Sequence, residues 1–248
     1  MNLIGHNFIA KRVLGRYNSL IAAGCHLPDM VPFLKDSLLT FDEIHESPET
    51  VYNYLKENDE KNIDLALGLM THSVKFGADK FNRDIDDWLL GNNKKLKTEI
   101  AEKITKASSI DLETALGPRM HNYLWCGLDF YILDKHPTFI SELNTAYREM
   151  GIPEISGILS RAFHKPLEII QNNIKKHIGL VVKHKITSKE NFVSFWKEFI
   201  SEIPEKDLID TDKAADTINF IENEFYEQWE IIIDRVVSDI KKRMSSYL

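Results

Sequence analysis

The sequence predicts an all-α protein, a multi-helix bundle that ends in a long C-terminal helix. Apolar residues recur mostly at spacings of three and four, which is the period of a helix with one buried face. Short alternating runs bounded by turn residues, the signature of half-buried strands, are scarce along the 248 residues. Residues that favour helix starts also stand before several of the periodic segments, and they give the order of the expected elements.

The first expected helix includes His6 and runs to about Ala23. Residues 24–29 are expected to break it, because Pro28 biases the preceding residue away from helical geometry. Asp29 would then be presented from a loop beside the end of a helix. A carboxylate in that position serves either as a helix cap or as a metal ligand.

Two further helix starts are marked by capping residues. Ser47 followed by Pro48 places a capping hydroxyl before a proline at the first helical position. Thr187 followed by Glu190 has the spacing of a capping box, in which the side chain of each residue accepts a hydrogen bond from the backbone N–H of the other. Both sites predict the start of a helix.

The last helix is expected to open at Asp210 or Thr211 and to continue almost to the C-terminus. Its apolar stripe predicts a core face or the interface of a homodimer formed through this helix. The stripe consists of Ile218, Ile221, Phe225, Trp229, Ile232 and Val236.

Length and composition place bounds on domain organisation and on partners. A chain of 248 residues with 43% hydrophobic content is long enough for one buried core, with a weak boundary near residues 151–153. We therefore expect a helical core over residues 1–150 and a helical extension over residues 151–248, packed together as one domain. The net charge of −7 argues against broad binding to duplex nucleic acid or to an anionic membrane surface. A basic stretch between Lys175 and Lys185 is interpreted as a solvated helix face, or as a groove for a phosphorylated substrate.

The expected compartment follows from the cysteines and from the lack of a targeting pattern. Cys25 and Cys126 stand in apolar surroundings and are expected to be buried free thiols, as in a reducing compartment. No basic segment precedes a long apolar run, and no window approaches the length needed to span a bilayer. We expect a cytoplasmic protein without a transmembrane segment.

Histidines and aspartates spread over the first half of the chain are the main functional signal. Imidazole and carboxylate are the usual protein ligands of zinc, and ligands taken from separate helices are typical of catalytic metals. The candidate ligands are His6, Asp29, His45, His72, Asp79, His121 and Asp129. His26, three residues before Asp29, is instead a candidate hydrogen-bond partner of that carboxylate.

The apolar neighbours of His72 place it well inside a helix, where its ring nitrogens need hydrogen bonds or a metal. Asp79 is expected to share its face but to lie about 10 Å further along the axis. The two residues would then serve neighbouring ions, or Asp79 would orient a ligand from another helix. His121 and Asp129 form a polar pair in an apolar segment, which indicates either metal ligation or a hydrogen-bond network.

The order of these motifs resembles the zinc-dependent phospholipase C and single-strand nuclease superfamily, and most of all its bacterial phospholipase C-like branch. The resemblance rests on residues 20–29 (LIAAGCHLPD), His45, residues 67–72 (LGLMTH), and His121 with Asp129. It covers roughly residues 1–135 and implies an all-α fold. It also implies zinc ions between helices and hydrolysis of phosphodiester bonds in phospholipids or nucleic acids.

The resemblance implies that Asp29, His45 and His72 form one zinc site, that His6 belongs to a neighbouring site, and that His121 opens the last ligand motif. The sequence departs from the family at two expected carboxylate positions, which hold Phe76 and Trp125. We expect Asp79 and Asp129 to replace those carboxylates. One or two zinc ions are then expected rather than three.

The predicted function is a zinc-dependent phosphodiesterase or phospholipase C-like hydrolase that acts on a small phosphodiester or a phospholipid. Metal-bound water would supply the nucleophile, with Asp29 or Asp79 as the general base. The alternative is a degenerate member that keeps the scaffold as a metal-binding or interaction protein, because Phe76 and Trp125 stand at ligand positions. A helical phosphohydrolase of the HD type is a third hypothesis, but it requires an adjacent His-Asp dipeptide, which this sequence lacks.

Overall fold

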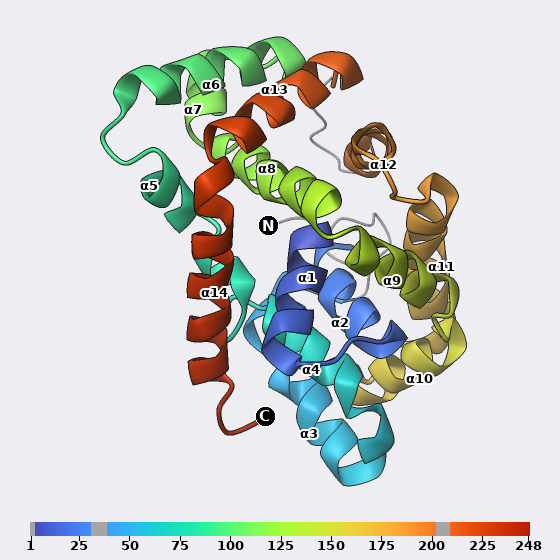
Figure 1. The fold of residues 1–248 in the computed structure, drawn as a ribbon. Coiled ribbons are helices and arrows are strands. Elements are labelled where there is room, and N and C mark those ends of the chain that lie inside the picture. The colour runs from blue at the N-terminus through green and yellow to red at the C-terminus, as the bar shows by residue number, and fades with distance from the viewer. Residues whose placement is uncertain (1–2, 31–38, 202–208) are drawn as a thin grey trace.

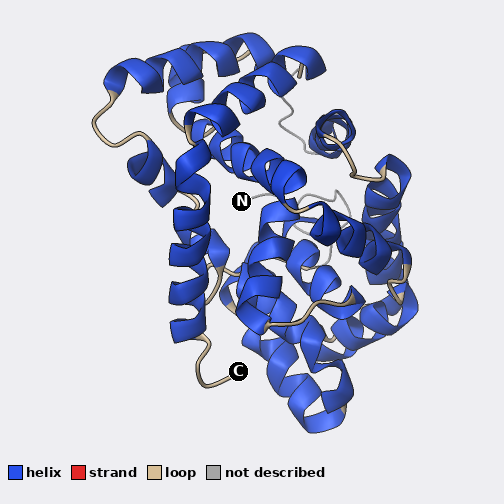
Figure 2. Ribbon diagram, viewed as in Figure 1, coloured by secondary structure: helices blue, strands red, loops and turns tan. Residues whose placement is uncertain are grey.

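The structure is a computed structural model that describes residues 3–30, 39–201 and 209–248. Within these ranges the protein is built from helices and contains no strand, which confirms the predicted all-α class (Figure 2). The helices of the first half are α1 (Leu3–Leu14), α2 (Ser19–Met30), the π-helical turn η1 (Asp42–Glu46), α3 (Glu49–Asn58), η2 (Glu60–Asn62), α4 (Ile63–His72), η3 (Ala78–Phe81), α5 (Asp84–Leu89), α6 (Lys94–Ser108), α7 (Leu112–Leu116) and α8 (Met120–Lys135). Those of the second half are α9 (Pro137–Arg148), α10 (Ile152–Phe163), α11 (Leu167–His184), α12 (Lys189–Ser201), α13 (Thr211–Glu224), η4 (Tyr226–Gln228) and α14 (Trp229–Arg243).

Helices α1, α2 and α4 form the centre of the packing (Figure 1). α1 contacts α2, α4, α8 and α14, while α3 packs on α4 and on α10. α8 crosses above this group and packs against α13, and α9 and α11 lie along the side where α2 faces them. The second half of the chain therefore packs on the first through α3 with α10, α2 with α11, and α8 with α13.

α2 and α4 approach each other closely because glycines face each other at their crossing. A Cβ atom placed on Gly24 would lie 2.2 Å from the carbonyl oxygen of Leu65, and one on Gly68 would lie 2.5 Å from that of Ile21. Glycine inside a helix costs about 1 kcal/mol relative to alanine, so the close backbone contact gives these two positions a structural reason. This contact sets the distance between the two helices that carry Asp29 and His72.

The predicted helix from His6 to Ala23 is wrong in its length. α1 ends at Leu14, and Gly15 follows with φ +67°, in the left-handed region that favours glycine. A second helix, α2, then begins at Ser19, and the side chain of Asn18 accepts hydrogen bonds from the N–H groups of Leu20 and Ile21. The first predicted helix is therefore two helices joined by a short turn.

The predicted break at residues 24–29 is also wrong, because α2 continues through Pro28 to Met30. Proline inside a helix removes one backbone hydrogen bond and crowds the carbonyl four residues earlier. Packing of the buried residues Cys25 and Leu27 outweighs that local cost, since tertiary contacts routinely override helix propensity. Asp29 is consequently presented from a helix rather than from a loop.

The predicted helix starts agree with the structure to within about two residues, but the capping bonds differ. No side-chain cap bond forms at the start of α3, so Ser47 does not cap this helix as predicted. The backbone N–H of Ser47 donates instead to the carbonyl oxygen of Asp42. α12 is capped by Ser188, whose hydroxyl accepts from the N–H of Asn191 at 3.3 Å, so the predicted Thr187 box is displaced by one residue. Asp210 caps α13 as predicted, accepting from the N–H of Lys213 at 3.2 Å.

The predicted single C-terminal helix is two helices, α13 and α14, separated by η4. The indole Nε1 of Trp229 donates to the carbonyl of Glu222 at 3.0 Å, which satisfies an acceptor near the end of α13. All six side chains of the predicted stripe are buried within the chain, so the core interpretation is confirmed. A homodimer through this stripe stays a prediction without support from the packing.

Other expectations for the chain concern its thiols, its surface and its longest apolar helices. Cys25 and Cys126 are buried free thiols, as predicted. Within the basic stretch the lysines are exposed, whereas His177 is buried. No helix among the described residues combines the length and the apolar character that crossing a bilayer requires.

Candidate metal centre

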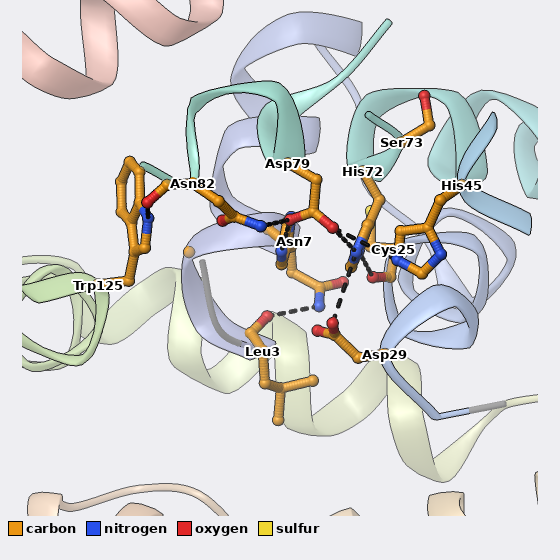
Figure 3. Close-up of polar contacts among 12 residues, drawn as sticks. Leu3, Asn7, Cys25, Asp29, His45, His72, Ser73, Asp79, Asn82 and Trp125 are labelled. Atoms are coloured by element: carbon orange, nitrogen blue, oxygen red, sulfur yellow. Dashed lines mark hydrogen bonds and ion pairs between the residues drawn. The ribbon is translucent and has the colours of Figure 1, made fainter. Parts of the chain in front are cut away.

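Four of the predicted ligands meet in the interior of the protein. His6 of α1, Asp29 of α2, His72 of α4 and Asp79 of η3 each offer a ligand atom, and these atoms all lie within 4.8 Å of one another. Figure 3 shows Asp79 at the middle of the group, with His72 and His45 on one side of it and Asp29 below. We call these four residues the metal cluster.

The prediction that His72 and Asp79 lie too far apart to share one ion is wrong. His72 is the last residue of α4, and the chain folds back through residues 73–77 into η3. Gly77 permits the tight return, since a Cβ atom there would lie 2.3 Å from the carbonyl oxygen of Thr71. Asp79 Oδ2 is thereby brought to 3.2 Å from His72 Nε2.

The second ring nitrogen of His72, Nδ1, fixes the orientation of the ring. Its Nδ1 donates to the carbonyl oxygen of Cys25 at 2.6 Å, which assigns the proton to Nδ1 in the neutral ring. The lone pair on Nε2 then faces Asp79 and Asp29, whose oxygens lie 3.2 Å and 3.6 Å away. A backbone carbonyl that orients a ring nitrogen in this way is typical of metal-binding histidines.

Two further histidines contact the same aspartate. His6 Nε2 lies 3.3 Å from Asp79 Oδ1, and the His6 ring stacks on that of His72 with centroids 3.6 Å apart. His45, held in η1, places its Nε2 3.3 Å from Asp79 Oδ2. His45 is therefore adjacent to the metal cluster but outside the four-residue group. Phe41 stacks on the His45 ring at 3.9 Å.

The charges of the cluster follow from burial and from these contacts. Burial alone would raise the pKa of Asp79, but His72 and the contacts with His45 and His6 hold it well below its usual range. Burial, and the nearby His72, hold the pKa of His6 well below its ordinary value. The pKa of His72 is raised, because Asp79 and Asp29 outweigh the effect of burial. Burial raises the pKa of Asp29. An ionised carboxylate surrounded by imidazoles is a favourable environment for a cation.

The donor set fits a transition-metal ion such as zinc. Both ring nitrogens of His6 are buried and neither meets hydrogen-bond geometry, which is costly for an imidazole unless a ligand satisfies it. Mixed imidazole and carboxylate ligands are the set that zinc commonly takes. The side chain of Asp29 is 27% exposed, against 7% for Asp79 and 0% for His6 and His72, so the cluster is most open at Asp29.

Sequence reasoning missed two residues that support the cluster. Asn82 donates from Nδ2 to Asp79 Oδ1 at 3.0 Å, and Trp125 donates from its indole Nε1 to the carbonyl oxygen of Asn82 at 3.2 Å (Figure 3). The spacing of Asp79 and Asn82, three residues apart near a turn, was a readable signal for the first bond. Trp125, at a position where the resemblance implies a carboxylate, thus supports the aspartate indirectly. Phe76 at the other such position packs edge-on against Tyr247.

His121, Asp129 and His26 do not join the metal cluster. His121 is half-buried at the start of α8. Asp129 is fully buried, and its Oδ1 accepts a hydrogen bond from the N–H of Gly5 at 2.8 Å, in the first turn of α1. His26 is not the predicted partner of Asp29, because its ring nitrogens form no hydrogen bond among the described residues. Its ring lies edge-on to Tyr147.

The chain was compared with models of protein families, with curated proteins and with solved structures. No match was found. The resemblance to the zinc-dependent phospholipase C and nuclease superfamily therefore stays a prediction.

Asp129 gives a testable pH dependence of stability. Burial raises its pKa to about 8, whereas an unfolded aspartate titrates near 4. Between these values the folded state holds one more proton than the unfolded chain, so this group lowers stability as pH rises, by at most about 1.4 kcal/mol per pH unit. Asp129→Asn cannot ionise and keeps an acceptor for Gly5. Urea denaturation across this range should show the variant gaining stability relative to the wild type as pH rises. A constant difference would mean that Asp129 titrates normally.

Proposed function

We propose that this chain is a metal-dependent hydrolase of phosphodiester bonds, with zinc bound by His6, Asp29, His72 and Asp79. The observation that carries the proposal is the convergence of these four ligand atoms within 4.8 Å, in a buried cluster whose Asp29 edge is open. The resemblance of the motif order to zinc-dependent phospholipases and nucleases supports the substrate class. Small phosphodiesters and phospholipids are the substrates proposed.

The contacts and exposure of each residue in the cluster suggest its role in the reaction. When bound, zinc polarises a phosphoryl oxygen and lowers the pKa of a coordinated water. Asp79 is in contact with His6, His45 and His72 and accepts a bond from Asn82, so its role is to hold the ligands together. Asp29 is the more exposed carboxylate. We assign Asp29, rather than Asp79, as the group that accepts a proton from the attacking water.

The proposal is tested by metal content and hydrolysis together, on protein purified without a histidine tag. Wild type should contain about one or two zinc ions per chain and hydrolyse bis(4-nitrophenyl) phosphate. His72→Ala should lose both, because it removes one of the four ligands of the cluster. His164→Asn is a matched control: it removes an exposed histidine, and asparagine tolerates the left-handed backbone found there. Wild type without metal after incubation with zinc would overturn the proposal.

A second candidate is a metal-binding protein without hydrolytic activity on the same scaffold. The observation that favours it is the occupation of two implied carboxylate positions by Phe76 and Trp125, both engaged in packing. It predicts stoichiometric metal, lost in His72→Ala, with no turnover of any phosphoester in a panel. Metal-dependent hydrolysis would exclude it.

A further inference from the structure

The return between α4 and η3, residues 73–77, decides where Asp79 lies. Two hydrogen bonds close this return. The N–H of Phe76 donates to the hydroxyl of Ser73 at 3.1 Å, and the N–H of Gly77 donates to the carbonyl oxygen of Ser73 at 2.8 Å. Both bonds lie within the return and do not attach it to another helix. Its position against the rest of the protein therefore depends in large part on what its side chains contact.

Phe76 joins the return to two other parts of the chain. Its half-buried ring lies edge-on to the ring of Tyr247, with centroids 5.4 Å apart and planes at 69°. Tyr247 in turn lies edge-on to Tyr52 of α3, with centroids 4.9 Å apart. Aromatic pairs in this arrangement are stabilising beyond the area that they bury. Tyr247 therefore connects the return to α3 through two ring contacts.

Tyr247 is itself held in place by the end of α14. Its N–H donates to the carbonyl oxygen of Met244 at 2.8 Å, and the side chain of Met244 is fully buried. α14 also contacts η3, the element that carries Asp79. Figure 1 shows the chain after α14 turning toward α3. Residues 244–248 thus provide a support on which the return can rest.

A second side chain of the return, Lys75, forms an ion pair with Glu49 of α3. The Lys75 side chain is 46% exposed, and ion pairs of exposed side chains contribute little, because water and salt screen the charges. The Lys75 ammonium also lies 5.3 Å from the centre of the Phe76 ring. The contact between Phe76 and Tyr247 is therefore the stronger attachment of the return.

We propose that Tyr247 is a positioning residue of the metal cluster. By packing on Phe76 it holds the return so that Asp79 Oδ2 lies 3.2 Å from His72 Nε2. Loss of the Tyr247 ring frees the return, and Asp79 with it, so the cluster binds a metal ion less tightly. This inference rests on the metal binding that the proposed function requires, whereas the support of the return by Tyr247 does not.

The test compares zinc binding by Tyr247→Ala with that of two matched variants. Tyr247→Phe keeps the ring and removes only the hydroxyl. Tyr226→Ala removes a half-buried tyrosine of η4, whose ring meets that of Tyr131 edge-on at the same centroid distance of 5.4 Å. Competition with a chromophoric chelator measures zinc affinity, and circular dichroism confirms helix content.

Tyr247→Ala should bind zinc about tenfold more weakly than wild type, which corresponds to about 1.4 kcal/mol. Tyr247→Phe and Tyr226→Ala should bind zinc as wild type does. Wild-type affinity in Tyr247→Ala would overturn the proposal. So would an equal loss in Tyr226→Ala, which would make the effect a general loss of stability, or an equal loss in Tyr247→Phe, which would assign it to the hydroxyl.

Hydrogen exchange of the metal-free protein separates this inference from the proposed function. Mass spectrometry follows the backbone amides of residues 73–81, which should exchange about tenfold faster in Tyr247→Ala than in wild type, because the return opens locally. The same amides should exchange at the wild-type rate in Tyr226→Ala. If wild type binds no zinc, faster exchange in Tyr247→Ala would uphold Tyr247 as the support of the return and refute the proposed function. Unchanged exchange in Tyr247→Ala would overturn the inference whether or not zinc binds.

Discussion

Asp79→Asn is expected to weaken metal binding strongly and to abolish hydrolysis while leaving the fold in place. Asparagine has nearly the same shape, and it can still accept the bond from Asn82. It removes the negative charge that lies within 3.3 Å of the Nε2 atoms of His6, His45 and His72. A divalent ion placed among neutral imidazoles then loses the closest compensating charge.

We expect zinc affinity to fall by a factor of about 1,000 or more, which corresponds to about 4 kcal/mol. Competition with a chromophoric chelator measures the affinity, and circular dichroism confirms helix content. Asp87→Asn, at an exposed position of α5, is the matched control and should bind zinc as wild type does. Equal zinc affinity in Asp79→Asn and wild type would place the metal elsewhere, and no zinc bound by either would make the cluster a histidine–aspartate hydrogen-bond network.

The identity of the cluster residues was largely predictable from the sequence. His6, Asp29, His72 and Asp79 were all among the seven candidate ligands. They were identified by residue type, and His72 also by its apolar neighbours, because a buried histidine is costly unless it is paired or coordinated. The all-α class was predictable from the helical spacing of apolar residues, because that spacing is visible within a short stretch of sequence. Both predictions use information that a short window of sequence contains.

The geometry of the cluster was not predictable in the same way. Treating His72 and Asp79 as members of one helix placed them about 10 Å apart, whereas the helix ends at His72 and the return at Gly77 brings the side chains into contact. Ser73 and Gly77 were available as signals of that end. Pro28 led to the opposite error: its local preference predicted a helix break, but α2 continues through it because packing overrides that preference.

The supporting bonds were beyond sequence reasoning because they join distant segments. The carbonyl of Cys25 that orients His72 is a backbone group. Every residue has such a group, so the residue types in the sequence do not indicate which one makes the bond. Trp125 supports Asn82 across 43 residues of chain. Asp129 was a reasonable ligand by type, yet its carboxylate accepts a bond from the first turn of α1. Residue type therefore indicated which side chains were candidate ligands, and only the fold showed which groups each of them contacts.

Gly24→Ala is expected to destabilise the protein by about 3 kcal/mol or more, because the added methyl has no space. The new Cβ would lie 2.2 Å from the carbonyl oxygen of Leu65 and 2.7 Å from the backbone nitrogen of Leu69, and backbone atoms of a packed helix cannot move aside singly. α2 must therefore shift away from α4. Urea denaturation followed by circular dichroism measures the loss.

Gly179→Ala is the matched control, since a Cβ atom at this exposed position inside α11 meets nothing within 4 Å. It should stabilise the chain by about 0.5 to 1 kcal/mol, because alanine is the better helix former. A Gly24→Ala protein as stable as wild type would show that the spacing of α2 and α4 is not fixed by this contact.

The same substitution should weaken metal binding in the molecules that stay folded. α2 carries both Asp29 and the Cys25 carbonyl that orients His72, while α4 carries His72 itself. A shift between the two helices changes the distances among all three groups, and metal affinity is sensitive to changes of a few tenths of an ångström. Zinc affinity should therefore fall in Gly24→Ala and stay at the wild-type value in Gly179→Ala, measured where both are folded. Loss of stability without loss of affinity would mean that the ligands adjust independently of the helices that hold them.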